Sequence, residues 1–180
     1  MTCVLHLIML ASAALELRAQ ATVPAFDEYQ VKAAFLYNFA KFVEWPAGTF
    51  ANANDPIGIC IAGANPFGAS LDNMVQGKKI GERTFAVRRI ADTQQAKGCQ
   101  ILFIGNADTK RVRSLLEALK GTAILTVGET DDFTAAGGMI AFQLAGPRVR
   151  IQIDIEPAES SHLKISSKLL SLAEIVKRQP

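Results

Sequence analysis

Three stretches of the chain are uncharged and mostly apolar, and they cover residues 57–63, 99–105 and 122–127. Each is rich in isoleucine, leucine or valine and is followed by glycine or a polar segment. Such runs, without alternating polar residues, are typical of strands buried on both faces of a parallel sheet. We therefore predict three buried strands, with residues 99–105 at the centre of the sheet.

Around these runs, apolar positions recur at helical spacing and predict helices over residues 28–45, 67–75, 109–120 and 167–176. Asp27, Asp108 and either Ser166 or Ser167 are suitably placed to cap three of these helices. The predicted inward face of the first helix is Val31, Phe35, Phe39, Phe42 and Val43. That of the last helix is Leu169, Leu170, Leu172, Ala173 and Val176.

Alternating apolar and polar residues predict further strands over residues 83–90, 139–144 and 148–155. The last two are separated by Ala-Gly-Pro, which is too short for a crossover, so they should form an antiparallel hairpin at the edge of the sheet. Strands that alternate with helices and end in a hairpin predict an α/β fold. We expect a three-layer α/β/α sandwich with a mostly parallel sheet and a C-terminal antiparallel hairpin.

The N-terminus is apolar for about the length of a signal-peptide core and is too short to span a bilayer. Ala19 and Ala21 supply the small residues that a signal peptidase accepts, so we predict cleavage before Thr22. Because this region lacks lysine and arginine before the apolar core, a misplaced start codon or a buried first helix stays an alternative. The prediction is a signal peptide over residues 1–21, a periplasmic location, and one domain over residues 22–180.

Composition narrows the classes of function. The chain has 180 residues, of which 49% are hydrophobic and 20% charged, enough for one domain with a full core. Its formal net charge is +2 and no long basic run is present. The electrostatic signature of a nucleic-acid-binding protein is therefore missing.

Few residues are suited to catalysis or to metal binding. His162, beside Ser160 and Ser161, is the one histidine that remains after cleavage, and adjacent residues on a turn point in different directions. The acidic segment 128–132 has neither the spacing of an EF-hand loop nor a histidine beside it. We predict no catalytic residue, no metal and no cofactor, and keep a hydrolase based on Ser161 and His162 as the third hypothesis for the function.

Cys60 and Cys99 are the two cysteines of the mature chain. If they lie on adjacent parallel strands, a disulfide that closes a loop of about forty residues would contribute at most roughly 4 kcal/mol in the chain-entropy model. A structural bridge, a bridge sensitive to reduction, and two free buried thiols are the three alternatives.

Several blocks of the sequence, in order, resemble the YfiR-like (HmsC-like) periplasmic repressor family. The longest is YQVKAAFLYNFAKFVEWP at residues 29–46. The others are residues 59–63, 66–68, 99–105, 125–128, 133 with 137–140, 148–153 and 163–170. Together they span essentially the whole mature chain.

The resemblance implies a non-enzymatic periplasmic protein, often a homodimer, that binds the periplasmic domain of an inner-membrane diguanylate cyclase and represses it. Cyclic-di-GMP, exopolysaccharide and biofilm formation would fall, and an outer-membrane, peptidoglycan-binding lipoprotein would sequester the repressor. It also implies that Cys60 and Cys99 match a pair that can form a disulfide. Ile140, Gln152 and Ala158 are the expected partner-binding residues.

The chain departs from the family at two places. It has no cysteines at residues 134–142, where some members carry a second bridge, so the Gly137-Gly138 segment should be less restrained. His162 stands where many members have glycine. The alternative function is a periplasmic small-ligand sensor that serves a histidine kinase or a TonB-type receptor.

Overall fold

The computed structural model describes residues 28–105 and 107–177. The predicted signal peptide, its cleavage site and the Asp27 cap lie outside these residues. A mixed sheet of seven strands organises the domain, in the order β3-β2-β4-β5-β6-β7-β9. Its strands are β2 (Ile57–Ala62), β3 (Phe85–Ile90), β4 (Ile101–Ile104), β5 (Leu125–Gly128), β6 (Ile140–Ala145), β7 (Arg148–Asp154) and β9 (Glu174–Val176). The strand predicted over residues 99–105 is β4, and β5 rather than β4 holds the middle position.

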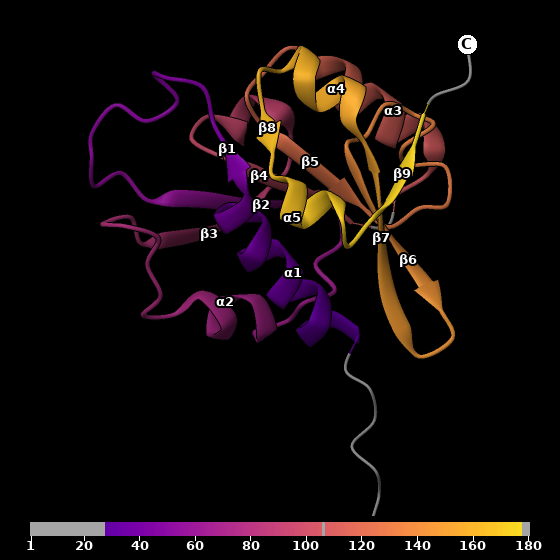
Figure 1. Ribbon diagram of the computed structural model, residues 1–180, viewed down its shortest axis with the longest axis horizontal. Helices are drawn as coiled ribbons and strands as arrows, with labels where there is room; N and C mark the ends of the chain where they lie inside the picture. The colour runs from indigo at the N-terminus through magenta and orange to yellow at the C-terminus, as the bar shows by residue number, and fades with distance from the viewer. Residues whose placement is uncertain (1–27, 106, 178–180) are drawn as a thin grey trace, which may run out of the picture.

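All neighbouring strands are parallel except β6 and β7, which form the predicted antiparallel hairpin. The prediction of an α/β fold with a mostly parallel sheet and a hairpin is therefore confirmed. Figure 1 shows β3 at one end of the sheet and β9 at the other, next to the projecting β6–β7 hairpin. A second, two-stranded antiparallel sheet of β1 (Val43–Glu44) and β8 (Lys164–Ile165) was not predicted.

The helices are α1 (Glu28–Phe42), α2 (Ser70–Val75), α3 (Thr109–Ala118), α4 (Ile155–Ser160) and α5 (Ser167–Leu170), with a 3-10 helix η1 (Thr93–Ala96). Asp108 and Ser166 cap α3 and α5 as predicted. Alternate residues of β2 and β4 enter two separate hydrophobic clusters. One includes Leu36 of α1 and Leu71 of α2, and the other includes Val112 and Leu116 of α3.

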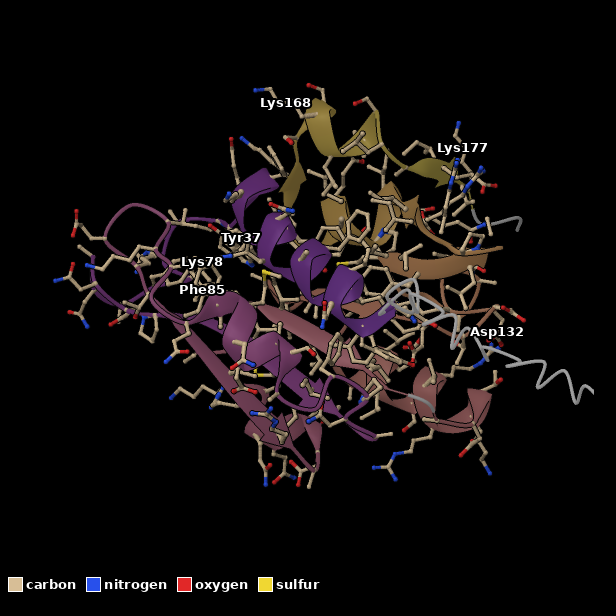
Figure 2. The ribbon with its side chains drawn as sticks, turned by 90° about the horizontal axis from the view of Figure 1, so that it is seen from below. Tyr37, Lys78, Phe85, Asp132, Lys168 and Lys177 are labelled. Atoms are coloured by element: carbon tan, nitrogen blue, oxygen red, sulfur yellow. A yellow bond between two sulfur atoms is a disulfide. The ribbon has the colours of Figure 1, made fainter. Side chains whose placement is uncertain are left out.

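The predicted inward face of the first helix was confirmed in part: Phe39 and Val43 are buried, but the buried stripe is rotated from the predicted one. The buried side chains of α1 are Lys32, Ala33, Leu36, Phe39 and Ala40, whereas Val31, Phe35 and Phe42 are half-buried. The small side chains of Ala33 and Ala40 lie against the core, and Phe35 packs beside Phe142 at a ring distance of 6.0 Å. Tyr37 contacts Phe85 and the ammonium group of Lys78, as Figure 2 shows. The helix also ends at Phe42 rather than Trp45, because the next two residues pair with β8.

The last predicted helix was also wrong beyond its first turn. It ends at Leu170, and residues 174–176 form β9, which pairs in parallel with Gln152, Ile153 and Asp154 of β7. The hairpin is therefore not the edge of the sheet. That edge is β9, and Leu172, predicted to face inward, is 70% exposed.

Candidate functional site

The Cys60–Cys99 disulfide joins two adjacent parallel strands, as the sequence predicted. Cys60 lies on β2, Cys99 lies just before β4, and their Cα atoms are 5.8 Å apart. Both residues are buried. Of the three alternatives left open by the sequence, the structure contains the bridge rather than two free thiols.

A buried hydrogen-bond network next to this bridge fixes the start of β4. The backbone N–H of Gly58 donates to the Oε1 of Gln100 at 2.7 Å, and the N–H of Gln100 donates to the carbonyl of Gly58 at 2.8 Å. The indole N–H of Trp45 donates to the Gln100 carbonyl at 3.3 Å. A Cβ on Gly58 would lie 2.1 Å from the carbonyl oxygen of Gly98, so the residue there must be glycine.

The three residues expected to bind a partner occupy different environments. Ile140, on β6, is fully buried and pairs with Val127 and Ile153. Ala158, on α4, is also fully buried. Gln152 is half-buried, and its side-chain amide donates to Glu174 of β9 at 3.4 Å. In this conformation Gln152 alone of the three reaches the surface, at the junction of β7 and β9.

The β9 edge, by which we mean Leu172 together with β9, carries two of the three large hydrophobic side chains that are exposed among the described residues. Leu172 is 70% exposed and Ile175 is 43% exposed, whereas the third such residue, Leu144 at 56%, lies on β6 in the hairpin. β9 pairs with β7 on one side only. An edge strand with exposed apolar side chains is a suitable surface for a partner, because its unpaired N–H and C=O groups can accept another strand.

A family model for YfiR/HmsC-like proteins matches residues 29–174. This chain belongs to the YfiR/HmsC-like family. Its members are periplasmic regulators of cyclic-di-GMP signalling rather than enzymes. The match covers the sheet, both halves of the disulfide and the start of the β9 edge.

In this YfiR/HmsC-like protein, a buried lysine joins the start of α1 to the end of β5, a feature that the sequence analysis missed. Lys32 is 3% exposed and forms ion pairs with Glu28, one turn earlier, and with Glu129, at 2.6 Å. Its ammonium group also lies 4.7 Å from the centre of the Tyr29 ring. A single lysine in an amphipathic helix is normally predicted to be exposed. The burial of Lys32 depends on its ion pair with Glu129, which is distant in the sequence, so the local pattern does not indicate it.

The charges of this cluster shift two pKa values. Burial alone would lower the pKa of Lys32, but its hydrogen bonds to Glu129 and Glu28 outweigh that effect and raise it. Burial and the neighbouring carboxylate of Glu129 raise the pKa of Tyr29. Both shifts favour the protonated forms in the folded protein.

The loop between β5 and β6 is held by an aromatic ring in place of a second disulfide. Phe133 is fully buried, and its ring lies between Gly128 and Gly138. A Cβ on Gly138 would lie 2.1 Å from Cε1 of the ring, and one on Gly128 would lie 2.2 Å from Cδ2. The N–H of Gly138 also donates to the Phe133 carbonyl at 2.9 Å. The Gly137-Gly138 segment thus has contacts that the missing cysteines had not suggested.

The hydrolase hypothesis gains no support from the positions of Ser161 and His162. Ser161 is buried and His162 is exposed. Within the part of the chain that the structure describes, no group of three or more His, Cys, Asp or Glu side chains is placed to hold a metal ion. None of the helices found there is long and apolar enough to cross a membrane.

His162 adopts the backbone conformation that glycine prefers. Its φ is 57°, the one positive value among the non-glycine residues described. Because a side chain in this region costs about 1–2 kcal/mol, we expect His162→Gly to stabilise the protein, by about 0.5–1 kcal/mol after the larger entropy of unfolded glycine is subtracted. Urea unfolding measures the change.

Glu159→Gly, at an exposed site inside α4, is the control and should destabilise the protein by about 1 kcal/mol. A loss of stability in both variants would contradict the prediction.

Proposed function

We propose that this protein is a non-enzymatic periplasmic regulator that binds the periplasmic domain of an inner-membrane diguanylate cyclase and represses it. Cyclic-di-GMP, exopolysaccharide and biofilm output would fall as a result. The family match over residues 29–174 is the observation that carries this proposal. An outer-membrane, peptidoglycan-binding lipoprotein would relieve the repression by sequestering the protein, which we expect to act as a homodimer.

The β9 edge is the surface that we assign to the cyclase. It combines an unpaired strand with the exposed side chains of Leu172 and Ile175, and Gln152 lies next to it. Apolar side chains on a sheet edge favour association with another chain. Ile140, on β6, and Ala158, on α4, are part of the core, so their substitution would act on the partner through packing.

Co-purification with the periplasmic domain of a candidate cyclase, together with cyclic-di-GMP measured in a deletion strain, tests the proposal. We expect a complex, and a rise in cyclic-di-GMP when the gene is deleted. Leu172→Glu should weaken the complex at least tenfold, because it places a charge in the apolar contact. Leu144→Glu, at the comparably exposed hairpin site, is the matched control and should leave the affinity unchanged. No complex and an unchanged cyclic-di-GMP level would refute the function. Equal losses of affinity in both variants would show that the interface is not specific to the β9 edge.

One observation favours the alternative function of a periplasmic small-ligand sensor for a histidine kinase or a TonB-type receptor. A cavity of about 200 Å³ lies between α3, the 136–139 segment and α4. Its lining includes the buried residues Thr126, Met139 and Ser161. A small polar molecule that raises the melting temperature of the protein, in the absence of any cyclase binding, would favour this function over repression.

A further inference from the structure

Two cavities, of about 310 Å³ and 480 Å³, open beside the start of β4. Both are lined by Thr49, Gly98 and Gln100, so they adjoin there, and we call the pair the Gln100 hollow. The smaller cavity also borders β2 and β3, and the larger one borders η1 and the end of α3. Because β2 and β3 lie at the opposite end of the sheet from β9, the hollow is distinct from the β9 edge (Figure 1).

The side-chain amide of Gln100 carries a donor that has no acceptor among the described residues. Gln100 is 3% exposed, and its Oε1 accepts from the backbone N–H of Gly58 at 2.7 Å. This bond fixes the orientation of the amide, because a backbone N–H pairs with the oxygen and not with the nitrogen. The Nε2 of Gln100 donates to no described residue. Buried donors nearly always have an acceptor, so the acceptor here must come from whatever fills the hollow.

The guanidinium group of Arg88 brings a positive charge to the smaller cavity. Its Nη2 donates to the carbonyl of Lys97 at 2.6 Å and lies 3.1 Å from Sγ of Cys99, which holds the group in place. None of the four ion pairs among the described residues includes Arg88 or Lys97, and Lys97 lines the larger cavity. The hollow therefore offers hydrogen-bond donors and positive charge to a ligand.

The one carboxylate that lines the hollow, that of Asp55, is already compensated. Its two oxygens accept from the backbone N–H of Asn52 at 2.8 Å and from the Asn52 side-chain amide at 3.1 Å. These hydrogen bonds, together with the charge of Arg83, lower the pKa of Asp55. Asp55 therefore does not neutralise Arg88, whose charge is left for a ligand.

We propose that the Gln100 hollow binds a small anionic sugar, by which we mean a hydroxyl-bearing ring with one carboxylate or phosphate group. The anionic group accepts hydrogen bonds from Gln100 and Arg88, which line the same cavity. The ring hydroxyls pair with Thr49, Thr93 and Gln94 at the larger cavity, since these side chains can both donate and accept. A neutral molecule would leave the charge of Arg88 without a partner. This site goes beyond the proposed function and does not depend on it.

Isothermal titration calorimetry of the full chain with galacturonate, glucose 1-phosphate and neutral galactose tests the site, and the two anions distinguish a carboxylate from a phosphate ligand. At least one anion should bind about tenfold more tightly than galactose, and Arg88→Gln should weaken that anion by about tenfold. Arg89→Gln is the matched control. It removes the same charge from the next residue of β3, but Arg89 pairs with Asp72, so the affinity should stay unchanged.

A second measurement follows Gln100 directly and needs no variant. In an NMR titration with the same anion, the side-chain amide resonances of Gln100 should shift, whereas those of Gln152, at the junction of β7 and β9, should not. Binding of neither anion, equal affinity for galactose, or equal losses in Arg88→Gln and Arg89→Gln would each overturn the proposal. Unchanged Gln100 resonances with the anion bound would also overturn it. None of these measurements involves a cyclase, so the site and the proposed function can fail separately.

Discussion

Lys32→Met is expected to destabilise the protein by about 3–5 kcal/mol. The substitution keeps an apolar stem of similar length but removes the charge that faces Glu28 and Glu129. Breaking a buried ion pair by removing one partner leaves the other charge uncompensated, and this costs more than the pair itself contributes. Chemical denaturation followed by circular dichroism gives the free energy of unfolding.

Lys41→Met is the matched control for this prediction. Lys41 is on the same helix, and its ammonium group lies over the Tyr37 ring, but the side chain is exposed. Its loss should cost no more than about 1 kcal/mol. The double variant Lys32→Met/Glu129→Gln should recover part of the loss, because it removes one of the charges left unpaired. Similar losses for Lys32→Met and Lys41→Met would show that the buried cluster contributes little.

The same cluster predicts how stability depends on pH. The folded-state pKa of Lys32 is raised above its ordinary value of 10.5, and that of Tyr29 above 10.0. The stability that these groups contribute is therefore fully present below about pH 10 and is lost as the pH rises through the folded-state values. Unfolding midpoints between pH 8 and pH 11 should fall more steeply for the wild-type protein than for Lys32→Met, and parallel curves would contradict this assignment.

Gly138→Ala is expected to destabilise the protein by about 3 kcal/mol. The new methyl group would lie 2.1 Å from Cε1 of the fully buried Phe133, whose other side is closed by Gly128. Overpacking of this kind forces the ring or the backbone to move. The φ of Gly138 is not positive, so the expected cost comes from the contact with the ring and not from the backbone conformation. Urea unfolding measures it.

A double-mutant cycle with Phe133→Leu separates this contact from other effects of Gly138→Ala. Phe133→Leu alone should cost about 1–3 kcal/mol through lost packing. In its presence Gly138→Ala should cost much less, because the ring atom that the methyl group meets is gone. Additive losses would show that the close approach of the ring to Gly138 is not the cause.

The hydrophobic pattern was enough to predict the interior of the sheet. The runs at residues 57–63, 99–105 and 122–127 carry no charge, which favours buried strands, and the short Ala-Gly-Pro link favours an antiparallel pair. The bridge between Cys60 and Cys99 was one of three alternatives from the sequence, and the adjacency of β2 and β4 in the structure decides for it. Local caps such as Asp108 and Ser166 were also predictable, since they depend on residues three positions away.

Short segments at the C-terminus were not predictable from the pattern. Residues 169–176 have apolar residues at helical spacing, yet the structure forms one turn of helix and then β9. The deciding contact is the ladder with Gln152, Ile153 and Asp154, more than twenty residues earlier in the chain. A strand of three residues is stabilised by its neighbour and has almost no signal of its own.

The sequence by itself determined the class of fold and the family, because these depend on periodicity and on blocks of residues that lie close along the chain. The tertiary structure alone decided that Lys32 is buried, that Phe133 fits between two glycines, that Arg88 contacts the disulfide, and that β9 forms the edge of the sheet. The partners of Lys32 and β9 come from distant segments, and those of Phe133 and Arg88 come from turns or strands that only the folded backbone brings into contact, so their charge, size or backbone groups are not visible in the local pattern.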